Sequence, residues 1–287
     1  MPQTINTNLV SLNAQRNLTM SQSSLATSMQ RLSSGLRVNS AKDDAAGLAI
    51  AERMNSQVRG MNVAMRNAND AISLSQTAEG ALGKVGDLFQ RMRELAVQSA
   101  NGTNTDADRV SLNEEFTQLA QEATRTLGGT QFNGQNILAT TNDATFQIGA
   151  NNTTDLDRIT VAAFDWAANT DINPLLGTAV ITGTDVPTMQ ITDIATSQTA
   201  LAAIDSAINA VNSQRANYGS IQNRFENVVS TLMVASENQS AARSRIMDAD
   251  YASETANLSR ASILQQAGNA MVAQANQLPQ QVLALLR

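Results

Sequence analysis

Both ends of the chain carry narrow stripes of apolar residues at helical spacing. Near the C-terminus every seventh residue is Leu or Met: Leu264, Met271, Leu278 and Leu285. Near the N-terminus apolar residues recur at intervals of three, four or seven: Leu18, Leu25, Met29, Leu32 and Leu36. A stripe this narrow cannot close a globular core, but it suits two helices lying against each other. The pattern predicts paired terminal helices, although periodicity alone also allows one helix of an ordinary bundle.

Two longer helical patterns lie between the ends. The first runs from residue 45 to about 99, which at 1.5 Å per residue gives a helix roughly 80 Å long. The second runs from 197 to about 245, with an apolar or aromatic residue every seven positions: Ile204, Val211, Tyr218, Phe225 and Leu232. A shorter helix is expected between the Thr105-Asp106 cap and Gly128-Gly129. Helices of this length predict an elongated molecule.

The centre of the chain carries a different pattern. Asn133-Gly134 is a hairpin-turn signal. Residues 146–148 and 159–161 alternate as short strands do. Residues 165–195 lose the helical period, so we expect a variable surface loop that assembly does not need. The fold class is therefore predicted to be mainly α: an elongated antiparallel helical rod or bundle with a small β-hairpin region at about 130–165, plus terminal helices pairing as a coiled coil.

Composition narrows the function classes. Aromatic residues make up only 3% of the chain although hydrophobic residues make up 42%, which favours slender helices over a thick aromatic core. The net charge of -6 argues against nucleic acid as a partner. The chain has no His and no Cys, which removes imidazole bases, thiolate nucleophiles and the usual zinc ligands. We therefore expect no catalytic, cofactor or metal site.

The remaining enzyme signal is weak. Residues 80–84, Gly-Ala-Leu-Gly-Lys, resemble a phosphate loop only loosely, because they lack its spacer and the Ser or Thr after Lys. No apolar stretch has the length needed to cross a bilayer, so we expect no membrane insertion. The N-terminus has neither the basic run nor the apolar core of a signal peptide, so secretion would need another route.

Four separate segments closely resemble bacterial flagellin: residues 31–50, 90–101, 130–138 and 258–287. The resemblance covers roughly residues 1–150 and 197–287, and one departure is Met247, where many members carry an acidic residue. It implies a short flagellin with two layers. An inner domain would combine residues 1–43 with 248–287, a rod-like outer domain would span 44–247, and the loop at about 165–195 would replace the large outer domains of longer members.

The resemblance also implies a function and partners. The chain would be exported unfolded through a type III pathway without a cleaved signal peptide and would polymerise at the filament tip, giving an extracellular propeller. Its partners would be other copies of itself, the flagellar cap, the hook-junction protein and an export chaperone. A flagellar hook–filament junction protein, which shares terminal coiled coils, is the alternative; a generic intracellular coiled coil or adaptor is a weaker one.

Two groups of residues are candidate contact sites. We name the first the assembly seam: Leu18, Leu25, Leu32, Leu264, Met271, Leu278 and Leu285. Apolar seams that neighbouring copies satisfy head to tail give open helical filaments. The second follows from the resemblance, since residues 90–101 match the stretch by which many flagellins bind a vertebrate Toll-like receptor. The matching positions are Arg91, Leu95 and Glu115, and packing against a neighbouring subunit is the alternative role for this face.

Overall fold

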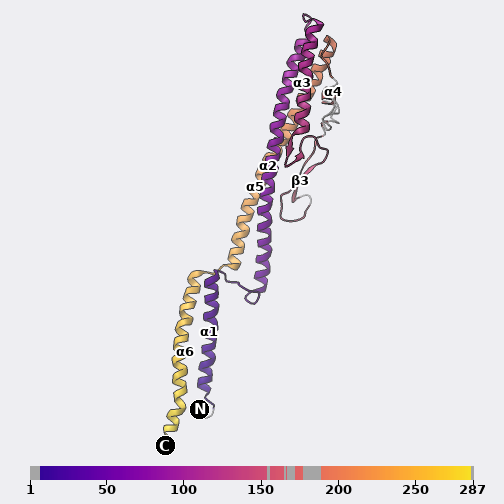
Figure 1. Ribbon diagram of the computed structural model, residues 1–287. Helices are drawn as coiled ribbons and strands as arrows, with labels where there is room; N and C mark the ends of the chain where they lie inside the picture. Colours follow the sequence, from indigo (N-terminus) through magenta and orange to yellow (C-terminus); the bar gives the residue numbers. More distant parts are fainter. Residues whose placement is uncertain (1–6, 154–155, 165, 167–171, 177–188, 286–287) are drawn as a thin grey trace. The chain divides into compact units, whose positions relative to one another are not determined.

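The computed structural model describes residues 7–153, 156–164, 166, 172–176 and 189–285, with side chains of the last helix described up to residue 277 (Figure 1). The chain divides into two compact units. Unit 1 combines Met1–Ser56 with Glu237–Arg287, and unit 2 comprises Gln57–Ser236. The described part is mainly helical, which confirms the predicted class.

Unit 1 is built on two terminal helices that lie side by side, α1 (Leu9–Ser34) and α6 (Tyr251–Leu285) (Figure 1). The Asn8 side chain caps α1 by accepting a hydrogen bond from the Ser11 backbone N–H at 3.1 Å. Gly35 ends the helix at φ 71°, a left-handed conformation that glycine adopts without strain. The start of α1 therefore has a definite N-cap.

A short backbone clasp joins the two chain segments that follow α1 and precede α6. The Arg37 N–H donates to the Met247 carbonyl at 2.6 Å, and the Ala249 N–H donates to the Gly35 carbonyl at 2.9 Å. Met247 is only 8% exposed and packs with Val38 and Ala51 in a small core. The apolar residue at 247 therefore belongs to this core.

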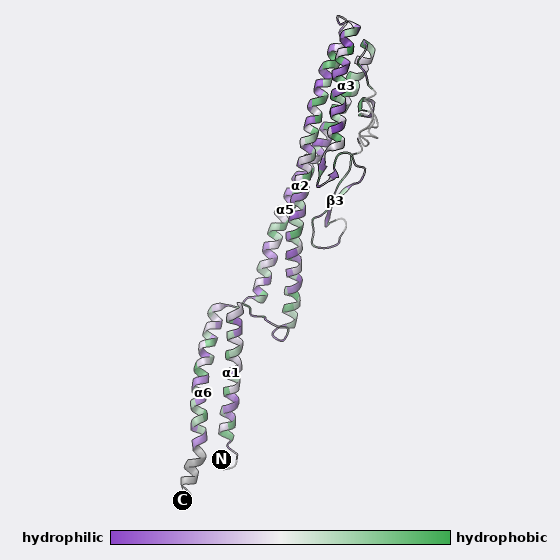
Figure 2. Ribbon diagram, in the orientation of Figure 1, coloured by the Kyte–Doolittle hydropathy of each residue, from purple (hydrophilic) through white to green (hydrophobic). Residues whose placement is uncertain are grey.

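Unit 2 is organised by α2 (Ala45–Ser99), α3 (Asp106–Gly129) and α5 (Ile194–Met247). Within unit 2, α2 and α5 run antiparallel, as hydrogen bonds from Arg93 to Asp205 and from Gln222 to Glu79 show. In Figure 2, hydrophobic and hydrophilic positions alternate along these helices. Their apolar faces meet in one core whose fully buried members include Leu82, Phe89, Phe116, Ile204, Val211 and Phe225. The predicted heptad positions of α5 up to 225 thus form the core face.

Two small antiparallel sheets follow α3. Strands β1 (Gln131–Phe132) and β2 (Gln135–Asn136) are joined by Asn133 and Gly134, at φ 50° and 76°, which confirms the hairpin signal. Strands β3 (Ala144–Gln147) and β4 (Arg158–Val161) pair with Phe146 opposite Ile159. The Asn67 amide of α2 donates to the Gln147 carbonyl at 2.9 Å, so the second sheet is anchored to α2.

Residues 165–195 differ from the expected surface loop. The segment contains a short helix, α4 (Asn173–Leu176), and five of its side chains are at most 1% exposed: Trp166, Ile172, Leu175, Leu176 and Ile191. They insert into the core of unit 2. The sequence pattern missed them because irregular segments bury residues without a helical or strand period. Residues 167–171 and 177–188 lie outside the described part.

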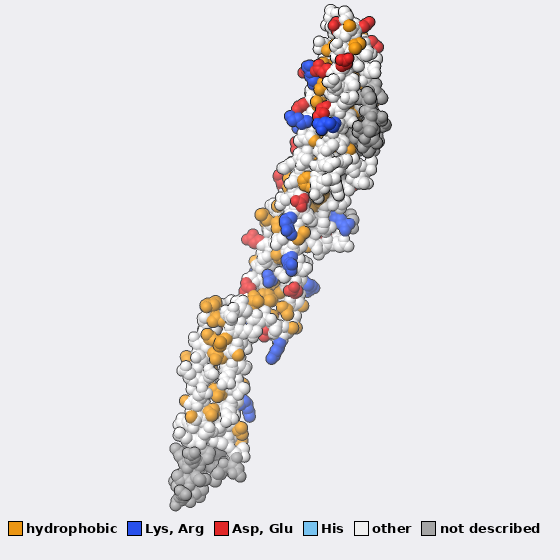
Figure 3. All heavy atoms as spheres, viewed as in Figure 1, with side chains coloured by type: hydrophobic (Ala, Val, Ile, Leu, Met, Phe, Trp, Pro, Cys, Tyr) orange, Lys and Arg blue, Asp and Glu red, His pale blue; other side chains and the backbone are white. Residues whose placement is uncertain are grey.

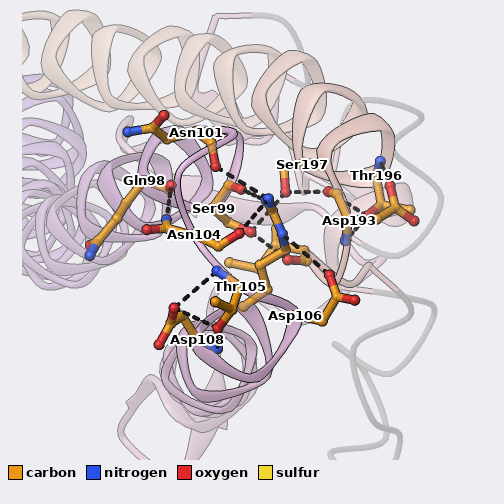
Figure 4. Close-up of polar contacts among 12 residues, drawn as sticks. Gln98, Ser99, Asn101, Asn104, Thr105, Asp106, Asp108, Asp193, Thr196 and Ser197 are labelled. Carbon is orange, nitrogen blue, oxygen red and sulfur yellow. Dashed lines mark hydrogen bonds and ion pairs between the residues drawn. The ribbon is translucent and has the colours of Figure 1, made fainter.

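A buried arginine, Arg109, fixes the corner between α2 and α3, and Figure 4 labels its backbone partners Ser99, Asn101 and Asn104. Arg109 is 5% exposed, and its guanidinium donates to the backbone carbonyls of Ser99, Asn101 and Asn104. A cation at these carbonyls also complements the negative end of the α2 dipole. The Ser99 hydroxyl in turn donates to the Ile191 carbonyl at 2.6 Å and accepts a hydrogen bond from Ser197 at 3.0 Å. Arg109 and Ser99 therefore tie the ends of α2, α3 and α5 together.

Candidate assembly surface

The facing sides of α1 and α6 combine small and polar residues with half-buried leucines. Gly268 lies so close to α1 that an added Cβ would sit 3.1 Å from Leu18 Cδ1. The Asn8 amide donates to the Ala275 carbonyl at 2.7 Å. Near the other end, Arg31 and Glu254 approach to 3.9 Å. These contacts are local and partly polar.

Many large apolar side chains of the same pair point away from the contact between the helices. Nine are at least 50% exposed: Leu9, Val10, Leu12, Met20, Met29, Tyr251, Ile263, Leu264 and Met271. Figure 3 shows hydrophobic side chains spread over the visible face of this unit, with few charges among them. Monomeric proteins rarely expose contiguous apolar surface on this scale without a partner. The terminal pair is therefore suited to be covered by other chains.

A groove of about 690 Å³ separates the two helices on one flank. Met20 and Leu264 line it together with Arg31 and Arg260. The α1 wall of the groove also carries Ser21, Ser24, Thr27 and Ser28. This flank combines apolar and polar groups that a second helix can contact.

The structure separates the residues of the predicted assembly seam into two sets. Leu18, Leu25 and Leu32 are half-buried, as are other residues of the α1 side that faces α6. Leu264 and Met271 are 51% and 58% exposed, because the small residues Ala261, Gly268 and Ala275 lie on the α6 face that meets α1. The two stripes thus do not simply interlock within one chain. The side chains of Leu278 and Leu285 lie outside the described residues, and the role of all seven in assembly stays a prediction.

The three residues expected at a receptor contact lie on two helices of unit 2. The Arg91 guanidinium donates to Glu115 at 2.8 Å from α2 to α3 and to Glu94 at 2.8 Å along α2. Hydrogen bonds to Glu94 and then Glu115 raise the pKa of Arg91 above its ordinary value, and all three side chains are exposed. Leu95 is only 1% exposed and belongs to the core beneath them. The receptor assignment is untested and stays a prediction.

The described residues give little support to a phosphate-binding loop, a metal site or a membrane-spanning helix. Gly80 and Lys84 lie inside α2, where backbone N–H groups donate along the helix and are not presented to a phosphate. Among the described residues, no group of three or more acidic, His or Cys side chains is arranged to hold a metal ion. No helix of the described part has both the length and the apolar character needed to cross a membrane.

These features define a class: a helical structural subunit whose ends pair with each other and expose apolar flanks. Residues 5–143 match the family described as the bacterial flagellin N-terminal helical region, and residues 201–286 match the bacterial flagellin C-terminal helical region. The chain belongs to the bacterial flagellin family, so it is a structural subunit of the bacterial flagellar filament.

Individual flagellins are similar to this chain along its whole length. A flagellin of Halalkalibacterium halodurans is 46% identical over 99% of both chains, and a flagellin of Serratia marcescens is 41% identical over 100% of both. Among solved structures, the crystal structure of Bacillus cereus flagellin is 34% identical, with a TM-score of 0.48 over 58% of this chain and 88% of that chain. The alternative of a hook–filament junction protein is not favoured by these relatives.

Proposed function

We propose that the terminal helix pair forms the inner layer of a helical homopolymer and that neighbouring copies cover its exposed flanks. The observation that carries this proposal is the exposure of apolar side chains: nine large apolar residues of α1 and α6 lie outside the contact between the two helices and are at least 50% exposed. Fully burying one such side chain contributes about 2 kcal/mol, so the flanks supply a substantial driving force for polymerisation.

In this proposal the two layers follow the predicted division. Residues 1–43 and 248–287 make the inner layer, and residues 44–247 make the outer one. The clasp between Gly35–Val38 and Met247–Ala249 then lies at the junction of the layers within each chain. Its backbone hydrogen bonds join the segment that follows α1 to the segment that precedes α6.

In this proposal the subunit is exported and assembled as other members of the family are. The chain is exported unfolded through a type III pathway with the help of a chaperone, and it adds to the filament tip beneath the cap, beyond the hook-junction protein. The filament is extracellular. Its role is structural and involves no catalytic step and no cofactor.

A second proposed interaction is with a vertebrate Toll-like receptor. Arg91 and Glu115 are exposed and paired, which offers a donor and an acceptor side by side. Leu95, being buried, acts in this proposal by supporting the helix face beneath them. The test is receptor activation by the monomer. Unchanged activation by an Arg91→Ala/Glu115→Ala variant contradicts the proposal.

The main proposal is tested by removing the inner layer. A chain of residues 44–247 keeps the core of unit 2 and is expected to be a soluble, folded monomer that does not polymerise. Circular dichroism and sedimentation of this chain and of the full-length protein provide the comparison. Filaments formed by the shortened chain contradict the proposal.

A further inference from the structure

Two exposed methionines share the groove flank of the terminal pair. Met20 is 55% exposed and lines the groove together with Leu264. Met271 is 58% exposed and follows Leu264 by seven residues, which places both on one side of α6. By contrast, Met92 and Met247 are buried in the two cores, at 0% and 8% exposure.

Exposure decides which thioethers an oxidant reaches. Hydrogen peroxide oxidises methionine to the sulfoxide: an S–O bond forms, the peroxide O–O bond breaks, and the two electrons from sulfur reduce the peroxide to water. The product is a polar, chiral side chain in place of a flexible apolar one. In the free subunit, Met20 and Met271 are open to this reaction, whereas Met92 and Met247 are protected by their packing.

We infer that Met20 and Met271 are peroxide-sensitive modification sites whose oxidation blocks addition of the free subunit to the filament. The inference rests on the proposed function, because it requires that neighbouring copies cover this flank. A sulfoxide on the flank is a polar group that must be buried at each new contact. Burying one such group without a full set of partners raises the critical concentration by about tenfold. Subunits already in the filament are shielded by the same contacts.

The experiment uses full-length protein and hydrogen peroxide. Three proteins are compared before and after treatment, each with Met29→Leu because that methionine is also 56% exposed on the terminal pair: the otherwise wild-type chain, Met20→Leu/Met271→Leu, and Met233→Leu. Leucine keeps the volume and apolar character of methionine. Met233 is the matched control, because it is 62% exposed but lies on α5 in unit 2. Mass spectrometry of peptides locates the sulfoxides, and sedimentation gives the critical concentration.

The expected result is specific to the two sites. Peroxide raises the critical concentration of wild type and of Met233→Leu by about tenfold, while Met20→Leu/Met271→Leu polymerises as before. Treatment of oxidised wild type with methionine sulfoxide reductases restores polymerisation. The inference is overturned if the double variant loses polymerisation as wild type does, or if peroxide-treated wild type carries sulfoxide at both sites and polymerises normally. Failure of the untreated wild type to form filaments instead contradicts the proposed function itself.

Discussion

Gly60 of α2 lies directly beneath Ala150 of the β3–β4 loop. A Cβ added to Gly60 would sit 2.7 Å from Ala150 Cβ and 3.2 Å from its Cα, closer than packed carbon atoms approach. Glycine at this position therefore lets the loop dock on the helix. The contact adds to the hydrogen bond from Asn67 to the Gln147 carbonyl, two turns further along α2.

Gly60→Ala is expected to lower stability by about 1–2 kcal/mol, because the clash with Ala150 outweighs the gain of a better helix former. Thermal unfolding gives the stability. Faster hydrogen exchange of the Ile148 amide, which donates to the Asp157 carbonyl at 2.7 Å, reports release of the loop. Gly83→Ala is the control, since nothing lies within 4 Å of a Cβ there and the substitution should stabilise α2 by up to about 1 kcal/mol. Equal effects of the two substitutions contradict the docking role.

Arg109→Ala is expected to destabilise unit 2 by about 3 kcal/mol, since it leaves the carbonyls of Ser99, Asn101 and Asn104 without their shared donor. Arg125→Ala is the matched control, because Arg125 is an exposed α3 arginine that pairs with Glu122 on the surface. Urea unfolding of both variants measures the difference. A loss for Arg109→Ala no larger than that for Arg125→Ala contradicts the corner assignment.

Acid should weaken two helix starts in particular. The hydroxyl and backbone N–H of Thr105 hydrogen-bond to Asp108 and lower the pKa of that carboxyl, and the Thr196 backbone N–H does the same for Asp193. Because the pKa of each carboxyl is lower in the folded state, the ionised carboxylate stabilises the fold fully at pH values above the ordinary pKa of 3.8. This stabilisation is lost as the pH falls through the lower pKa of the folded state. Asp108→Asn and Asp193→Asn should therefore show a smaller fall in Tm between about pH 4 and pH 2 than wild type. Asp70→Asn is the control, and an identical fall in all four proteins contradicts the prediction.

Trp166→Ala is expected to cost about 3–5 kcal/mol, because the indole is 1% exposed and stacks edge-on against Phe164 at 4.5 Å between ring centres. Deletion of residues 165–195 should lower the stability further, since it also removes four more buried side chains of unit 2. Calorimetry of both variants provides the measurement. A deletion variant that melts like wild type would restore the view of this segment as a dispensable loop.

Much of this architecture follows from sequence periodicity, and the exceptions have physical causes. The bounds of α2 and α3 and the Asn133-Gly134 turn were predictable because caps, turns and long apolar stripes are local signals. The burial of Trp166 and Ile191 was not, because an irregular segment carries no period that shows which residues face inward. Arg109 was missed for a related reason: its partners are backbone carbonyls, which leave no trace in the sequence.

The assembly surface shows the same limit. Periodicity located the stripe through Leu264 and Met271, but it did not show whether this side of α6 faces α1 or solvent. The side of α6 that meets α1 is selected by small residues such as Gly268, which allow close approach and contribute little to an apolar pattern. The stripe is therefore exposed in the single chain, and the resemblance to a polymerising family supplied its interpretation.

The central claim is that neighbouring copies cover the exposed flanks of the terminal pair. The most direct test is the critical concentration for polymerisation of Leu264→Gln/Met271→Gln, measured by sedimentation. Its control is Val97→Gln/Val110→Gln, which changes side chains 50% and 52% exposed in unit 2. The account predicts that both proteins fold as wild type does, but that the first needs at least about 100-fold more protein to polymerise, since two apolar contacts are lost per subunit. A critical concentration for Leu264→Gln/Met271→Gln equal to that of wild type would contradict the account.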